Sequence, residues 1–278
     1  MNKLSATLKI SRTENVVITF IAVIIGAIIS AGIQILQPNV FWGAVSLAFA
    51  CAGGNVINDI YDVEIDKTNK PDRVLPSGSL SISAAKIIYT IMLIISIALS
   101  VVNGIVSLIF VLAVNIILFL YSADLKRRIF LSNLIVALLT ASALIYGGMM
   151  AGNITGSVIP AIFAFLINFI REIVKDMEDA KGDSEKGVTT LPNKFGFVKT
   201  KKIIYLVTFT LILATFYPFF FKIYKIEYFI VVMVLVNPVL IYFLKSLIDE
   251  NSSKNLKKLS FLLKLNMLFG MIAIYLGI

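Results

Sequence analysis

Histidine is absent from the 278-residue sequence, and cysteine occurs once, as Cys51. These absences exclude disulfide bonds within the chain, zinc sites built from Cys or His, Ser-His-Asp triads and imidazole general bases. A metal ion would need oxygen ligands, which suit a hard cation such as Mg²⁺, Mn²⁺ or Ca²⁺. Carboxylates are therefore the candidate metal ligands in this sequence.

Charged residues are also scarce, at 15% of the chain, whereas soluble proteins carry about 25%. Hydrophobic residues make up 59%, and the mean hydropathy is +0.94. This composition is typical of a membrane protein. No polar stretch is long enough to form a separate soluble domain, so we expect one domain over residues 1–278.

Nine apolar runs are long enough to approach the roughly 20 residues that a spanning helix needs. They cover residues 16–36, 41–60, 84–102, 105–122, 131–151, 157–174, 201–221, 227–245 and 260–277. The sequence therefore predicts an all-α membrane protein, with nine transmembrane helices in a single bundle.

The connections between these helices differ sharply in charge. One set includes the N-terminus and receives every Lys and Arg except Lys222 and Lys225, and every acidic residue except Glu227. Positive-inside bias places this set in the cytoplasm and explains the net charge of +9 without nucleic acid. Chemistry confined to one face of the cell membrane favours an interfacial enzyme with a cytoplasmic cap. A cation transporter is the alternative, but it needs a polar path to the far side, and almost no ionisable residue lies within the runs 16–36, 84–102, 201–221 and 260–277.

The segment NDIYDVEID, residues 58–66, follows one apolar run directly. Asp59, Asp62 and Asp66 stand at positions i, i+3 and i+7, which lie on one stripe of a helix. Asn55 and Asn58 precede them by one turn and extend the same polar face. Alone, such a motif is typical of a solvated acidic helix end.

The same spacing recurs in REIVKDMEDAKGD, residues 171–183, where Arg171 and Lys175 precede the acids. The second set of carboxylates is Asp176, Asp179 and Asp183. Six carboxylates directed into one bundle would repel one another unless cations lay between them. The matched spacing therefore predicts Mg²⁺ bound by all six acids.

Magnesium is usually bound by one or two carboxylates together with phosphate oxygens and water, so two acidic helix ends suggest a bridged diphosphate. In a membrane protein this points to a prenyl diphosphate donor, which ionises to an allylic cation as the diphosphate leaves. Tyr61, Tyr121 and Tyr146 lie near predicted helix ends, where a ring could face the cation or the prenyl tail. The alternative is that they are ordinary interfacial tyrosines.

NDIYDVEIDKTNKPDRVLPSG, the segment DMEDAKGD followed by GVTTLP, and YSADLKR resemble the signatures of the UbiA superfamily of intramembrane prenyltransferases. The resemblance spans residues 10 to 200. It implies that Asn58 and the carboxylates bind Mg²⁺ and the donor diphosphate, and that Arg73 and Lys126 contact phosphate oxygens. The loops after the two motifs would cap the site. Val74, Leu75 and Pro76 depart from the family's usual loop.

KDMEDAKGDSEKGVTTLP most resembles the branch that prenylates a prenylated glycerol phosphate in archaeal ether-lipid synthesis. This implies geranylgeranyl diphosphate as donor, geranylgeranylglyceryl phosphate as lipid-phosphate acceptor and no redox cofactor. Prenylation of an aromatic acceptor, 4-hydroxybenzoate or a naphthoate, remains open. We expect contact with membrane lipids and no obligatory protein partner.

Overall fold

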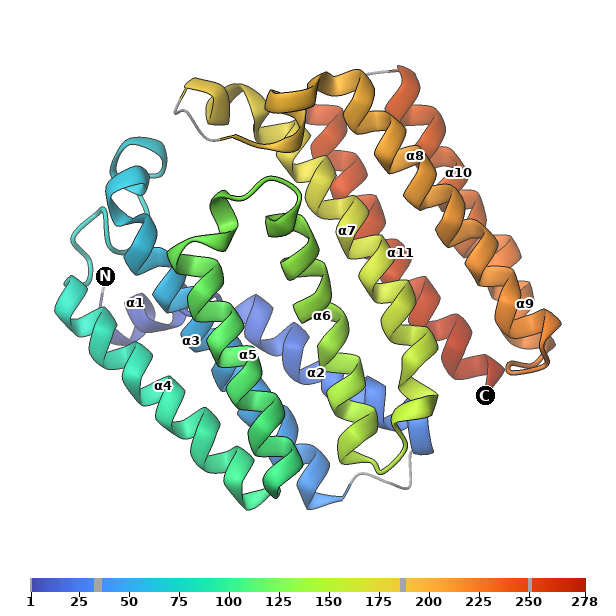
Figure 1. Cartoon of the computed structure of the whole chain (residues 1–278), viewed down its shortest axis with the longest axis horizontal. Helices are drawn as coiled ribbons and strands as arrows, with labels where there is room; N and C mark the ends of the chain where they lie inside the picture. Colours follow the sequence, from blue (N-terminus) through green and yellow to red (C-terminus); the bar gives the residue numbers. More distant parts are fainter. Residues whose placement is uncertain (1, 33–36, 186–188, 250–251) are drawn as a thin grey trace. The chain divides into compact units, whose positions relative to one another are not determined.

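The computed structural model describes residues 2–32, 37–185, 189–249 and 252–278, without the side chains of residues 69, 181–185 and 249. Within these ranges the chain is helical and contains no strand (Figure 1). The α-helices are α1 Lys3–Ile10, α2 Thr13–Ala31, α3 Pro38–Asn69, α4 Ile82–Val102, α5 Ile105–Ala123, α6 Leu131–Met150, α7 Ile154–Glu185, α8 Leu191–Phe220, α9 Ile226–Val231, α10 Asn237–Asp249 and α11 Ser253–Gly277. A 3₁₀ turn, η2, covers Leu125–Arg127, and a π-helical turn, η3, covers Val232–Val236.

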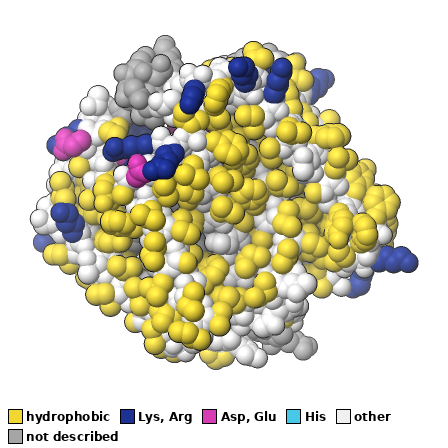
Figure 2. Space-filling model, viewed as in Figure 1, with side chains coloured by type: hydrophobic (Ala, Val, Ile, Leu, Met, Phe, Trp, Pro, Cys, Tyr) yellow, Lys and Arg dark blue, Asp and Glu magenta, His cyan; other side chains and the backbone are white. Residues whose placement is uncertain are grey.

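The described ranges contain nine helical segments long and apolar enough to cross a membrane, and α9, η3 and α10 together form one of them. This confirms the predicted all-α class and the number of spans. Helices suit a bilayer because they satisfy their own backbone hydrogen bonds. Hydrophobic side chains cover most of the face shown in Figure 2, and many large ones are exposed, including Val102 at 77% and Leu206 at 67%. The protein is a multi-pass membrane protein.

The helix α3 is longer than the apolar run that predicts it. It begins at Pro38 and continues to Asn69, so the whole NDIYDVEID segment is helical. Its 32 residues correspond to about 48 Å at a rise of 1.5 Å per residue, whereas a bilayer's hydrocarbon core is about 30 Å thick. One end of α3 therefore extends beyond the hydrocarbon core and can carry polar groups.

Two compact units make up the chain. The first contains residues 1–126 and 143–157, and the second contains residues 127–142 and 158–278. In the first unit, α3 packs against α2, α4 and α5, and half or more of its membrane window is buried. In the second unit, α11 packs against α9, η3 and α10. The acidic motif of residues 58–66 belongs to the first unit, and that of residues 171–183 to the second.

Small residues let α2 and α6 approach closely within the first unit. Gly26 faces the backbone of Leu144, and Gly147 faces the backbone carbonyl of Val23. A Cβ atom at either glycine would overlap the opposing backbone. Glycine is common at such crossings because helix association in a bilayer depends on close van der Waals packing.

A buried polar cluster joins α8 to the last helices of the second unit. The Asn237 amide donates to the Thr215 hydroxyl at 3.2 Å, and the Tyr228 hydroxyl donates to the Thr215 carbonyl at 2.8 Å. Pro218 lies one turn after Thr215 inside α8. The cluster thus satisfies buried polar groups close to a proline within the helix.

The glycine contact gives a stability test. Gly147→Ala should lower the melting temperature of the purified protein in detergent, because overpacking a close contact costs about 1–3 kcal/mol. Gly270→Ala is the matched control, since no neighbouring atom lies within 4 Å of a Cβ at that position. The control should melt at or slightly above the wild-type temperature, because alanine favours a helix over glycine. Equal melting temperatures for the two variants would contradict the close contact.

Candidate active site

The first motif forms the expected acidic stripe on α3. Asp59 and Asp66 are buried, with 7% and 5% of their surfaces exposed, and Asp62 is half-buried. Glu64 lies off this stripe, is exposed and pairs with Lys67 at 2.8 Å. The spacing therefore separates three sheltered carboxylates from one solvated one.

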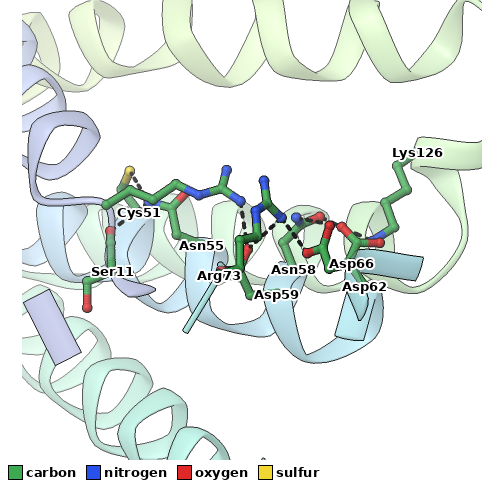
Figure 3. A network of polar contacts seen from close by, with 10 residues as sticks. Ser11, Cys51, Asn55, Asn58, Asp59, Asp62, Asp66, Arg73 and Lys126 are labelled. Atoms are coloured by element: carbon green, nitrogen blue, oxygen red, sulfur yellow. Dashed lines mark hydrogen bonds and ion pairs between the residues drawn. The ribbon is translucent and has the colours of Figure 1, made fainter. Parts of the chain in front are cut away.

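Each sheltered carboxylate is paired with a basic side chain from another part of the first unit. Arg12 Nη2 lies 2.7 Å from Asp59 Oδ1. Arg73 Nη1 lies 2.5 Å from Asp66 Oδ2 and 3.5 Å from Asp59 Oδ1. Figure 3 shows Arg73 reaching towards Asp59 and Asp66 and Lys126 reaching towards Asp62. These pairs reduce the cost of shielding the carboxylates from water.

Lys126 lies in η2, immediately after α5, and its side chain is only 13% exposed. Its Nζ atom lies 2.6 Å from Asp62 Oδ1 and 3.2 Å from Asn58 Oδ1. The Asn58 amide in turn donates to Asp62 Oδ2 at 3.0 Å. Asn58 and Lys126 therefore both contact the Asp62 carboxylate.

The loop that carries Arg73 is held by apolar side chains. Val74 and Leu75, where the sequence departs from the usual family loop, are 3% and 7% exposed. They belong to a buried cluster with Ala6 and Ile10 of α1. These contacts fix the loop beside α1. Asn55, also predicted here, donates to the Ser11 carbonyl at 2.9 Å and so ties α3 to the end of α1.

The second motif lies in the second unit, on α7. The Asn133 amide donates to Asp176 Oδ2 at 2.8 Å, and Asp179 is exposed. Arg171 and Lys175 both pair with Glu172, at 3.2 and 3.0 Å. The side chain of Asp183 lies outside the described residues.

The three predicted tyrosines do not share one environment. Tyr61 is exposed on α3 and makes an edge contact with Phe119, and Tyr121 is half-buried near the end of α5. Tyr146 is fully buried, bonds to Ser107 at 2.6 Å and lies against Gly43.

The position of Tyr146 corrects the prediction that its ring lies near the acidic face. Gly43 precedes Asp59 by about 24 Å of helix at 1.5 Å per residue. Tyr146 therefore packs near the opposite end of α3. The prediction rested on the position of Tyr146 near the end of an apolar run, and that position does not reveal which end of α3 the ring packs against.

Three polar residues that contact the two motifs were not predicted from the sequence. Arg12 pairs with Asp59 across 47 positions in the sequence, and Asn133 bonds Asp176 across 43. Glu172 is adjacent to predicted residues but off the i, i+3, i+7 stripe. Asn133 follows the segment YSADLKR by six residues, whereas Arg12 stands in no motif.

Among the described residues, no three acidic or cysteine side chains converge as a metal cage. The donor set nevertheless fits Mg²⁺, which needs only one or two carboxylates when phosphate oxygens and water complete its shell. The α3 stripe supplies carboxylate and amide oxygens, with Arg and Lys beside them for an anion.

A model of the UbiA prenyltransferase family matches residues 19–268. The chain belongs to this family. The matched segment includes both carboxylate motifs, Arg73 and Lys126, but begins after Arg12.

Relatives in this family match the chain over nearly its whole length. Digeranylgeranylglyceryl phosphate synthase of Saccharolobus solfataricus is 35% identical over 99% of this chain and 97% of its own. A solved structure of a digeranylgeranylglyceryl phosphate synthase in membranes has a TM-score of 0.85 and 34% identity, covering 100% of this chain and 99% of that one. A UbiA homologue from Archaeoglobus fulgidus, solved with GPP and Mg²⁺, shares the fold at a TM-score of 0.73 and 20% identity, with 97% and 99% covered.

Asp62 and Glu64 form a matched pair for testing the stripe. Asp62→Asn should reduce prenyl transfer by about 100-fold or more, the scale at which groups that stabilise developing charge act. Glu64→Gln should retain wild-type activity because Glu64 is exposed and off the stripe. Product formation in membranes measures both. Equal activities of the two variants would contradict the role of the stripe.

Proposed function

We propose that this protein transfers a geranylgeranyl group from geranylgeranyl diphosphate to the hydroxyl of geranylgeranylglyceryl phosphate. The products are digeranylgeranylglyceryl phosphate and diphosphate. The observation that carries this choice of acceptor is the full-length similarity to digeranylgeranylglyceryl phosphate synthases, at 35% identity. The paired carboxylates and cations on α3 support the donor half of the reaction.

In the proposed reaction the bond between C1 of the donor and its diphosphate oxygen breaks, and a C–O bond to the acceptor forms. The hydroxyl proton of the acceptor is taken up by the released diphosphate. Mg²⁺, when bound, would neutralise the charge of the departing diphosphate. Asp59, Asp62 and Asp66 would hold the ion, and Arg73 and Lys126 would turn from these carboxylates to phosphate oxygens. Arg and Lys are suited to this exchange because their charge-assisted bonds to phosphate are strong.

We assign the second motif to the same reaction. Asp176, Asp179 and Asp183 would provide further oxygen ligands for Mg²⁺, as the repeated spacing suggests. Arg171 and Lys175 would contact the phosphate groups of the substrates, and Glu172 holds both until a phosphate arrives. Both units would form one prenyltransferase domain, since the family match runs through both.

The proposed site faces the cytoplasm. The support is the distribution of Lys and Arg: all except Lys222 and Lys225 lie in the set of connections that includes the two carrying the motifs. The geranylgeranyl tails of both substrates would lie among the helices, while the phosphates meet the basic residues at the membrane surface.

The acceptor is tested with the purified protein, Mg²⁺ and geranylgeranyl diphosphate. Geranylgeranylglyceryl phosphate should give the diether, detected by mass spectrometry, because the acceptor hydroxyl captures the allylic cation. Parallel reactions contain 4-hydroxybenzoate or a naphthoate. Product with an aromatic acceptor and none with the glycerol phosphate would refute the lipid assignment and leave the family in place.

The second motif is tested through its metal requirement. Asp179→Asn should raise the Mg²⁺ concentration for half-maximal activity by about 10-fold or more, the usual cost of disturbing a metal site. Glu227→Gln is the control, because Glu227 is an exposed acid that lies outside both motifs. An unchanged Mg²⁺ requirement in Asp179→Asn would remove this residue from the metal site.

A further inference from the structure

We infer that Arg12 is a phosphate-binding residue of the donor site, presented by the short helix α1. This inference rests on the proposed function, because it assumes that the carboxylates of α3 serve a diphosphate. Arg12 lies outside both motifs and precedes the segment that the family model matches.

The contact geometry places Arg12 beside the same oxygen atom as a predicted phosphate-binding residue. Asp59 Oδ1 lies 2.7 Å from Arg12 Nη2 and 3.5 Å from Arg73 Nη1. The carboxylate side chain is only 9% exposed, whereas the Arg12 side chain is 35% exposed and that of Arg73 is 28%. The two guanidinium groups thus form the accessible rim over a sheltered carboxylate, where an incoming anion meets them first.

The helix α1 fixes Arg12 to the structure that fixes Arg73. Ala6 and Ile10 are fully buried in the apolar cluster that holds the loop residues Val74 and Leu75. The Ser11 carbonyl, next to Arg12, accepts the Asn55 amide of α3. One cluster therefore sets the positions of both arginines relative to the acidic stripe.

The backbone of Arg12 gives an independent reason to look for a role of its side chain. Arg12 has φ 51° and ψ 67°, in the left-handed region, between α1 and α2. Glycine and asparagine occupy this region more readily than arginine. An unfavourable conformation kept at a ligand-binding site is a recognised sign of function, and here the sheltered Asp59 lies beside it.

The charges balance before substrate binding: Arg12, Arg73 and Lys126 face Asp59, Asp62 and Asp66. If the carboxylates held Mg²⁺, the basic groups would lose their present partners. A diphosphate offers them new ones, and the planar fork of arginine fits two phosphate oxygens. The competing explanation is that Arg12 only neutralises Asp59. In that case, removing Arg12 would lower the Mg²⁺ requirement and leave the affinity for diphosphate unchanged.

The test compares Arg12→Asn with Arg12→Lys and with Lys9→Gln in the full-length protein. Asparagine removes the charge but tolerates the left-handed backbone, so folding should be preserved. Lysine keeps the charge without the fork. Lys9 is an exposed basic residue of α1, so Lys9→Gln is the matched control.

Calorimetric titration with inorganic diphosphate at saturating Mg²⁺ measures binding without turnover. Arg12→Asn should bind diphosphate about 10-fold or more weakly, since charge-assisted bonds are lost, and Arg12→Lys should fall between it and the wild type. In kinetics, Arg12→Asn should raise the KM for the donor and leave the KM for the acceptor unchanged. Lys9→Gln should match the wild type in both measurements.

Wild-type diphosphate affinity in Arg12→Asn, together with a lower Mg²⁺ requirement, would overturn the inference and leave Arg12 as a counter-ion of Asp59. This outcome is distinct from failure of the proposed function. If the proposed function failed, the wild-type protein would bind diphosphate but would make no diether from geranylgeranylglyceryl phosphate.

Discussion

The pairing of carboxylates with cations on α3 is the interaction on which the candidate site depends. A carboxylate sheltered from water is costly unless a cation and hydrogen bonds compensate it. Asp59, Asp62 and Asp66 receive that compensation from the N-terminal segment, from the loop after α3 and from the turn after α5. Three distant parts of the sequence must therefore meet at one helix end before the site exists.

The same pairing prepares the site for its proposed substrate. Oxygen ligands for a hard cation and basic groups for an anion already lie side by side, at 2.5 to 2.7 Å in the shortest pairs. A complex of Mg²⁺ with diphosphate offers a cation to the carboxylates and an anion to the basic side chains. Each set could therefore exchange its present partner for one of these ions.

The membrane as solvent explains why large aliphatic side chains cover the outside of the molecule as well as its interior. Large aliphatic side chains such as Val102 and Leu206 point outwards, while glycine allows contacts such as that of Gly147 with α2 inside. Lipid tails solvate the outer side chains, so the close interior contacts hold the helices together. Polar chemistry is then confined to helix ends that extend past the hydrocarbon core, as α3 does.

The sequence by itself determined the spans and the acidic stripe, because both depend on local periodicity: about 20 apolar residues cross a bilayer, and positions i, i+3 and i+7 share a helix face. It also placed Arg73 and Lys126 through the family resemblance. Tertiary structure alone decided that Arg12 pairs with Asp59, that Asn133 bonds Asp176 and that Tyr146 is buried far from the stripe. Helix direction and contacts between residues more than 40 positions apart leave no local pattern, since they arise only when separate helices pack.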